Sequence, residues 1–428
     1  MSSEWRVAKV EDIAAPFSTA LATGPFGSAI SSKYFVASGV PVIRGSNLSA
    51  DISTRLIDAD LVFISQDKAN EFQRSVAKRG DLVFTCWGTI NQVGLIDGRS
   101  KFDSYIVSNK QMKLTIDPAK ADHRFIYYVF SGPAKQNEIL ENGIGSSVPG
   151  FNLGQLKRHE VLLPPVQEQR QIADFLETLD DRITLLRETN ATLEAIAQAL
   201  FKSWFVDFDP VRAKAEGRQP EGMDATTAAL FPDSFEESEL GLVPSGWAVG
   251  VLGDIASIKG GKQLEKEFFD DRGLNPIFGG AGVMGHTDLK NAQGFVITVG
   301  RVGAYCGQFF WHLGEAWVNN NASHIQPMRN LDAVWIYQWL RATNIDHIKK
   351  GAAQPFVSNG DLAELKLALP TGELVDRFVE VVGPVYEQMA SLQAQAKTLT
   401  QLRDTLLPRL ISGQLRLPEA ETLLEKAL

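Results

Sequence analysis

The run WRVAKVEDIA at residues 5–14 has a close counterpart, WAVGVLGDIA, at residues 247–256, an offset of 242 residues. A second set of matches lies further along the chain at an offset of 206. It pairs Gly145, Pro149, Gly154, Leu156, Leu163 and Pro164 with Gly351, Pro355, Gly360, Leu362, Leu369 and Pro370. Internal repetition indicates that one structural unit occurs twice. We therefore expect two similar globular domains, of which the second is shorter.

The framing segments repeat while the interior segments differ, as expected of one scaffold that carries two different recognition surfaces. A chain of 428 residues is also too long for one ordinary core. The expected parts are a first domain (1–160), a long helix (161–209), a connector (210–246), a second domain (247–366), a second long helix (367–417) and a C-terminal tail (418–428).

Both domain interiors have the pattern of β-rich chain. Residues 81–85 and 294–298 are apolar, rich in β-branched side chains and bounded by glycine, which predicts strands. Residues 123–131 and 333–342 carry apolar side chains at helical spacing, which predicts short helices. Glycine-rich connections are expected at residues 23–28, 278–285 and 300–307. Each domain is therefore expected to be α+β with an irregular, loop-rich sheet.

After Pro164 and Pro165 the apolar pattern changes to a heptad repeat, which is typical of a coiled coil. In the first copy the a and d positions are Ile172, Leu176, Leu179, Ile183, Leu186, Asn190, Leu193, Ala197, Leu200 and Trp204. In the second copy they are Phe378, Val382, Val385, Met389, Leu392, Ala396, Leu399, Arg403, Leu406 and Leu410. Nine of ten are apolar in each copy. Pro384 predicts a kink or a fresh helix start.

A helix of roughly 40 residues spans about 60 Å, longer than a small domain is wide. Much of each helix must therefore find a partner helix. We expect the two helices to pair with each other as an antiparallel coiled-coil spacer; pairing between chains and packing of each helix on its own domain are the alternatives. The aromatic run at residues 201–210 either anchors a partner protein or packs back on the helix pair.

The net charge of −9 is unevenly distributed. Residues 159–246 hold 7 basic and 17 acidic residues, whereas residues 1–158 hold 18 basic and 15 acidic residues. A local basic surface is enough for DNA binding, so the overall acidity does not exclude it. No apolar stretch is long enough to cross a membrane. The two cysteines, Cys86 and Cys306, have no partners at metal spacing and favour a reducing cytoplasm.

The sequence has no catalytic or cofactor-binding motif with the flanking elements or the spacing that such a motif requires. The run GAGVMG at residues 280–285 fits a dinucleotide fingerprint, but no helix is predicted after it, so a structural loop is expected. The histidines have no zinc-binding spacing, and no motif for methylation of a base is present. Asp180 and Asp181 lie in a charged stretch that we interpret as surface. The sequence therefore predicts neither a catalytic residue nor a metal site.

Several segments resemble the specificity subunits of type I restriction-modification systems. They are LLPPVQEQRQIADFL (162–176), LDDRI (179–183), FKSWFVDFDP (201–210), ELGLVPSGW (239–247), PIFGGAGVMG (276–285) and RDTLLPRLISGQL (403–415). The resemblance extends from Trp5 to about Leu417. The second helix departs from the pattern, because LPTGELVD (369–376) replaces the usual start rich in glutamate and glutamine.

The resemblance implies a recognition subunit without chemistry of its own. Each domain would be a target recognition domain that reads one half of a bipartite, asymmetric site in double-stranded DNA. The helices would set the spacing and dock two methylation subunits, and two motor-nuclease subunits could join them. S-adenosylmethionine, ATP and magnesium would then be used on those other subunits, and none would be bound by this chain. The alternative is a non-catalytic coiled-coil scaffold without DNA specificity.

Arginine and lysine suit guanine or phosphate, and asparagine and glutamine suit adenine, when they lie on loops that reach DNA. In the first domain the candidates for DNA binding are Ser28, Lys33, Arg44, Asn47, Trp87, Thr89, Asn91 and Gln92. In the second they are Lys259, Lys262, Gln263, His286, Arg301, Tyr305, Asn319, Asn320 and Asn321.

Overall fold

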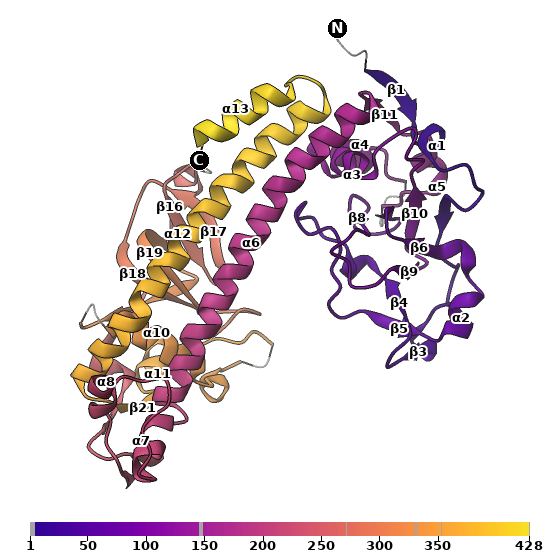
Figure 1. The fold of residues 1–428 in the computed structure, drawn as a ribbon. Helices are drawn as coiled ribbons and strands as arrows, with labels where there is room; N and C mark the ends of the chain where they lie inside the picture. Colours follow the sequence, from indigo (N-terminus) through magenta and orange to yellow (C-terminus); the bar gives the residue numbers. More distant parts are fainter. Residues whose placement is uncertain (1–4, 145–148, 271, 330–331, 352, 428) are drawn as a thin grey trace. The chain divides into compact units, whose positions relative to one another are not determined.

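A computed structural model describes residues 5–144, 149–270, 272–329, 332–351 and 353–427. The chain forms two compact units, Met1–Leu186 with Gln395–Leu428, and Arg187–Ala394. The long helices α6 (Val166–Phe205) and α12 (Gly372–Ile411) each contribute one part to either unit (Figure 1). The repeat position Gly145 lies outside the described residues.

The first unit contains two main sheets. One has the strand order β2 (Leu21–Thr23), β10 (Gln111–Thr115), β7 (Asp81–Thr85), β8 (Val93–Leu95). The other has the order β3 (Phe35–Val36), β5 (Val62–Ile64), β4 (Val40–Ile43), β9 (Ser104–Val107), β6 (Val76–Lys78). Helices α2 (Gln66–Asn70), α3 (His123–Ser131) and α4 (Pro133–Glu141) complete it. The strand predicted at residues 81–85 and the helix predicted at 123–131 are confirmed.

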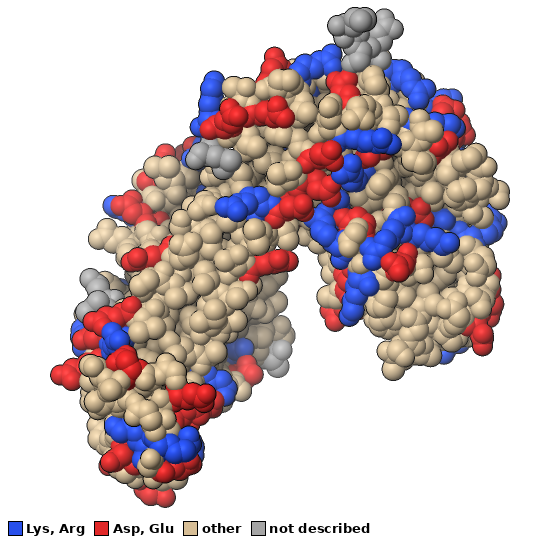
Figure 2. Space-filling model, in the orientation of Figure 1, with Lys and Arg blue, Asp and Glu red and all other residues tan. Residues whose placement is uncertain are grey.

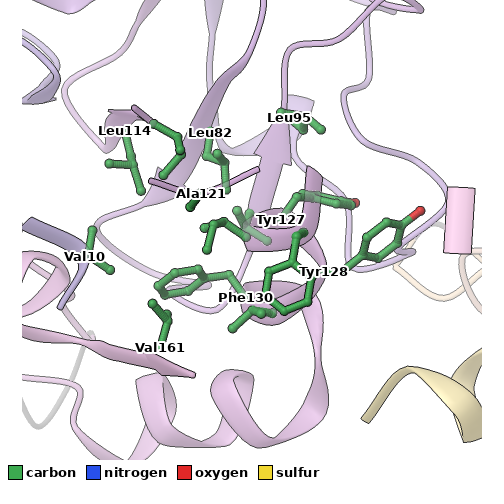
Figure 3. Close-up of a cluster of buried hydrophobic side chains, with 14 of the residues drawn as sticks. Val10, Leu82, Leu95, Leu114, Ala121, Tyr127, Tyr128, Phe130 and Val161 are labelled. Carbon is green, nitrogen blue, oxygen red and sulfur yellow. The ribbon is translucent and has the colours of Figure 1, made fainter. Parts of the chain in front are cut away.

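Helix α3 supplies the centre of the first core (Figure 3). Tyr127, Tyr128 and Phe130 are buried there against Leu82 of β7 and Leu114 of β10. Asp122 caps the helix, since its carboxylate accepts the amides of residues 124 and 125. Burial of such large side chains contributes about 1.5–3 kcal/mol each, so this cluster holds helix and sheet together.

The second unit is built on one six-stranded sheet. Its strand order is β15 (Ala256–Gly260), β20 (Ala322–Pro327), β18 (Ala292–Gly300), β19 (Phe309–Val318), β16 (Asn275–Gly279), β17 (Gly282–Thr287). Helix α10 (Ala333–Ala342) packs on β18, β19 and β20, and confirms the predicted helix. The connection predicted at residues 278–285 is instead a hairpin of β16 and β17, because Gly282 adopts a φ of 93° that closes a tight turn.

The two sets of repeat matches meet in one small sheet per unit. Strand β1 (Arg6–Lys9) pairs with β11 (Glu160–Leu163), and Arg6 lies opposite Leu163. Strand β14 (Ala248–Val251) pairs with β21 (Lys366–Leu369), and Ala248 lies opposite Leu369. These partners differ by the offsets of 242 and 206. The repeated segments therefore form the pair of strands with which each domain begins and ends in the sequence.

Short helices repeat in the same way beside these strands. They are α1 (Val10–Ile13) and α5 (Leu153–Arg158) in the first unit, and α9 (Leu252–Ile255) and α11 (Asn359–Ala363) in the second. Asp12 accepts the amide of Lys9 at 3.1 Å, and its counterpart Asp254 accepts that of Val251 at 2.9 Å. The polar side chains of the repeat thus serve as helix caps.

In the first unit, the beginning of α6 and the end of α12 run antiparallel. Glu168 pairs with Arg416 just beyond α12, and Asp180 pairs with Arg403, so residue numbers rise along one segment as they fall along the other. The predicted seam residues here are all buried: Ile172, Leu176, Leu179, Ile183, Leu186, Leu399, Leu406 and Leu410. Asp180 is fully buried too, so the interpretation of its stretch as surface is wrong for that residue.

In the second unit, the end of α6 packs on the beginning of α12. Phe201 and Trp204 of α6 lie 5.7 and 5.8 Å from Phe378 of α12, measured between ring centroids. The aromatic run therefore packs back within the chain, one of the two expected outcomes. Of the predicted seam residues, Trp204, Met389 and Leu392 are buried and Leu193 and Leu200 are partly buried.

Helix α12 continues through Pro384, so the prediction of a fresh helix start there is wrong. The proline removes one backbone donor, but Val382 and Tyr386 on either side of it are buried and hold the helix in place.

The segment between the long helix α6 and β14 folds into α7 (Asp209–Ala215), α8 (Ala225–Ala229) and a hairpin of β12 (Phe235–Ser238) and β13 (Gly241–Pro244). The expected C-terminal tail forms α13 (Leu417–Ala427). Among the described residues, no helix combines the length and the apolar character needed to cross a bilayer.

Candidate nucleic-acid interface

A groove of about 690 Å³ in the first unit, here called the first groove, gathers half of the predicted contacts of that domain. Arg44, Trp87, Thr89 and Gln92 line it. They come from the ends of β4 and β7 and from the turn that leads into β8, so the two main sheets of the unit bring them together.

Arg44 and Asn47 have different roles in this groove. Asn47 is buried, and its side-chain amide donates to the carbonyl groups of Ile57 and Ala59 at 3.0 and 3.3 Å. Its oxygen accepts the amide of Arg44. Asn47 therefore positions the loop and cannot reach a base edge. Among the described residues the Arg44 guanidinium makes one hydrogen bond, from Nη2 to Asp60 O, so Nη1 keeps its donors for a ligand in the groove.

Two residues that line the groove were not predicted from the sequence. Lys110 is exposed in the tight turn between β9 and β10, and Gln111, the first residue of β10, is buried. Ser108 Oγ donates to Gln111 Oε1, while Gln111 Nε2 has no partner among the described residues. The turn-forming pair Ser108 and Asn109 between two apolar runs is the signal that could have indicated them.

The other predicted contacts of the first domain lie outside the lining of the groove. Ser28 and Lys33 are exposed, and the Lys33 ammonium lies 4.7 Å from the centroid of the Tyr34 ring. Asn91 is half-buried. On the face drawn in Figure 2, basic and acidic side chains alternate over the first domain. The described residues on this face of the first domain therefore form no single broad basic patch, and the first groove is its candidate site.

A larger groove of about 1110 Å³ in the second unit, here called the second groove, is lined by Lys259 and Lys262 from the predicted set. Lys290 and His324 also line it and were missed. His324 lies directly opposite Lys259 in the β15–β20 register. Burial lowers the pKa of His324, and the neighbouring charge of Lys259 lowers it further, which keeps the imidazole neutral near pH 7.

Arg301 lies beside this second groove. A Cβ atom placed on Gly260 of the lining would stand 3.3 Å from Arg301 Nη1, and Arg301 Nε has no partner among the described residues. Gln263, Tyr305, Asn320 and Asn321 are exposed outside the lining, and His286 is half-buried on β17.

Asn319 is buried, and its oxygen accepts the amide of Asn320 at 2.8 Å, so it shapes the turn after β19 rather than facing a ligand. Within the described parts of the chain, no group of three or more His, Cys, Asp or Glu residues is arranged to hold a metal ion.

Both halves of the repeat match the same family model. The model describes the type I restriction modification DNA specificity domain, and it matches residues 3–195 and again residues 244–397. The chain belongs to this family. Each match covers one copy of the repeat and extends into the long helix that follows it, so the duplication is a property of the family's domain rather than of one local motif.

Relatives that match most of the chain are named specificity subunits. The chain is 26% identical over 412 residues to the type I restriction enzyme HindI specificity subunit of Haemophilus influenzae, covering 80% of this chain and 88% of that one. It is 23% identical over 394 residues to the MjaIX specificity subunit of Methanocaldococcus jannaschii, covering 85% and 86%.

The fold is similar to a solved structure, the S subunit of a type I restriction-modification system from M. genitalium. The TM-score is 0.59 at 18% identity, over 96% of each chain. This likeness supports the mixed helix-and-strand architecture with two repeated domains.

Proposed function

We propose that this specificity-domain protein reads a bipartite, asymmetric DNA site, with each domain reading one half. One observation carries the proposal: each of the two repeated domains has its own polar groove, and the two grooves differ in their place on the sheet and in their lining. The first groove presents Arg44, Gln92 and Lys110, whereas the second presents Lys259 and Lys290. Different side chains recognise different base edges, so the two half-sites should differ in sequence.

We further propose that the long helices dock two methylation subunits, and that motor-nuclease subunits join that complex. The chemistry would lie on those partners: methylation of adenine N6 with S-adenosylmethionine, and ATP- and magnesium-dependent cleavage. A cytoplasmic location fits the two thiols, since Cys86 and Cys306 are both free and buried. Burial raises the pKa of the Cys86 thiol to about 12, which makes it unreactive. The family membership disfavours the alternative of a scaffold without DNA specificity.

The direct test is co-expression with a methylation subunit of a type I system, followed by genome-wide mapping of methyladenine. A single bipartite motif should appear. Exchange of residues 1–160 for those of a relative should change one half of that motif and leave the other intact. Methylation without sequence preference would overturn the proposal.

Arg301→Ala is expected to weaken recognition of one half-site by about 5- to 150-fold, the range for loss of one good base contact. The Arg301 guanidinium lies beside the second groove and makes no ion pair among the described residues, so its loss should affect ligand binding more than folding. Competition binding with oligonucleotides altered in either half-site measures the effect. Arg341→Ala, on α10 and paired with Glu194, is the control that should bind normally. Equal losses at both half-sites would count against this role.

Affinity for the second half-site is expected to rise as the pH falls from about 7.5 to about 5.5. Free His324 has a pKa below its ordinary value, and a phosphate in the second groove would raise it, so DNA binding is coupled to proton uptake in that window. His324→Gln should flatten the dependence, measured as the dissociation constant against pH. The exposed His347, outside the groove lining, provides the control His347→Gln, which should keep the slope.

A further inference from the structure

We propose that one exposed aromatic side chain at the same point of each domain, Trp87 in the first and Phe356 in the second, stacks against bases at one step of its half-site. This inference rests on the proposed function and adds to it a contact that distorts the DNA rather than reading a base edge.

Trp87 stands on a loop that is clamped by backbone hydrogen bonds. Gly88 N donates to Pro149 O at 3.1 Å, and Phe151 N donates to Cys86 O at 2.8 Å. Ile144 and Gly150 exchange two further bonds of 2.8 and 2.7 Å. Gly88 has a φ of 88°, a conformation that favours glycine and turns the chain sharply after Trp87.

The second domain repeats this clamp bond for bond. Gly303 N donates to Pro355 O at 2.9 Å, and Val357 N donates to Arg301 O at 3.0 Å. Lys350 and Phe356 exchange the two further bonds of 2.9 and 2.8 Å. Gly303 has a φ of 83°, close to that of Gly88. The clamp is therefore a common device of the two domains, although the sequences around it differ.

The aromatic side chain comes from opposite strands of the clamp in the two domains. In the first, Trp87 lies across a bridge from Gly150, and a Cβ there would stand only 2.7 Å from Trp87 Cζ3, so the indole rests on the glycine. In the second, Phe356 lies across the equivalent bridge from Val302. Trp87 is 51% exposed and Phe356 is 42% exposed. About half of each residue therefore remains exposed and available for contact with a ligand.

Neighbouring charges favour DNA as the occupant. Trp87 lines the first groove together with Arg44 and the exposed Lys110, and Arg301 directly precedes the clamp residue Val302 in the second domain. Cationic side chains beside an exposed aromatic ring can bind the phosphate groups of DNA while the ring stacks on a base. The clamp already fixes the backbone that carries the ring, which lowers the entropy cost of binding, and stacking on a base is worth about 1–3 kcal/mol. Apolar wedges of this kind unstack a base step.

The test places 2-aminopurine at successive positions of each half-site and binds the duplexes to the complex of the full chain with its methylation subunits. The wild-type complex should raise the fluorescence several-fold at one position in each half. Trp87→Ala should abolish the rise in the first half only, with about a 5- to 150-fold loss of affinity, the equivalent of the stacking energy. Phe356→Ala should do the same in the second half only, and Trp87→Phe should retain most of the signal.

Two matched controls distinguish stacking from general loss of apolar surface. Phe17 is as exposed as Trp87 and Phe268 is 46% exposed, and neither lines a groove nor belongs to a clamp. Phe17→Ala and Phe268→Ala should leave both signals unchanged. Sequence-selective binding with unaltered 2-aminopurine signals in Trp87→Ala and Phe356→Ala would overturn this inference and leave the proposed function standing. A wild-type complex without sequence-selective binding would overturn both.

Discussion

Asp180→Ala is expected to lower the free energy of unfolding of the first unit by about 3–5 kcal/mol, the cost of leaving one partner of a buried ion pair alone. Arg403 Nη1 donates to Asp180 Oδ1 at 2.9 Å, and the Tyr128 hydroxyl donates to Asp180 Oδ2 at 2.6 Å. The side chains of Arg403 and Asp180 are 4% and 0% exposed. Without the carboxylate, a buried guanidinium keeps its charge and a buried hydroxyl loses its acceptor.

The cost is large because Asp180 stands in the middle of a longer polar network. Arg55 Nη2 donates to the Tyr128 hydroxyl at 3.1 Å, and Arg55 Nη1 pairs with Asp97 and Glu177 at 2.9 and 2.8 Å. The network joins α12, α6 and α3 to two loops of the recognition domain. Buried polar networks of this kind favour one packing arrangement, because a shift would leave further groups unpaired besides the Arg55 Nε, which has no partner among the described residues. In the first unit this network therefore holds the domain to the helix segments in one orientation.

Hydrogen exchange of the full-length chain, followed by mass spectrometry, measures the effect because it reports each unit separately. The amides of β7, β10 and α3 should lose protection in Asp180→Ala. Asp181→Ala is the matched control: Asp181 is 59% exposed and pairs with Arg99 at the surface, so a change below about 1 kcal/mol is expected. Similar losses in the two variants would contradict a special role for the buried carboxylate.

The sequence predicted the frame of this fold better than its sites, for physical reasons that Asp180 and Asn47 illustrate. The first and last strands of each domain, and the helix caps beside them, lie in segments that recur at constant offsets, so their correspondence could be inferred from the sequence. The heptad pattern marked position 179 as buried, but only the domain packed over the helix buries position 180 as well. Asn47 had the expected chemistry for DNA, yet its amide is used to hold a loop.

The missed groove residues reflect contacts that no local pattern encodes. His324 joins Lys259 only through the register of β15 on β20, two strands more than sixty positions apart in the chain. Gln111 reaches the first groove because β10 pairs with β7, where it lies opposite Thr85. By contrast, Trp87 and Arg44 were predicted from residue type and loop position alone, and the sheets then brought both to one groove.

Phe378→Ala is expected to destabilise the second unit by about 3–5 kcal/mol, the range for removing a buried phenylalanine. Its ring centroid lies 5.7, 5.8 and 5.2 Å from those of Phe201, Trp204 and Phe205, so one truncation removes contacts to three aromatic side chains of α6. Edge-to-face pairs of this kind add about 0.5–1.5 kcal/mol each beyond the buried area.

The measurement is again hydrogen exchange, here over residues 187–394, with Val381→Ala as the control. Val381 lies on the same helix but is exposed, so its truncation should cost about 0.5 kcal/mol or less. A loss below about 1 kcal/mol in Phe378→Ala would contradict the aromatic cluster as the main contact between the helices in this unit. Phe378→Leu should recover part of the loss because it refills volume without restoring the aromatic pairs.

Asp180→Asn should recover little, since an amide of the same shape leaves the charge of Arg403 uncompensated. The two units would then hold their recognition domains by different physical means, a charged network in the first and shape-dependent aromatic packing in the second.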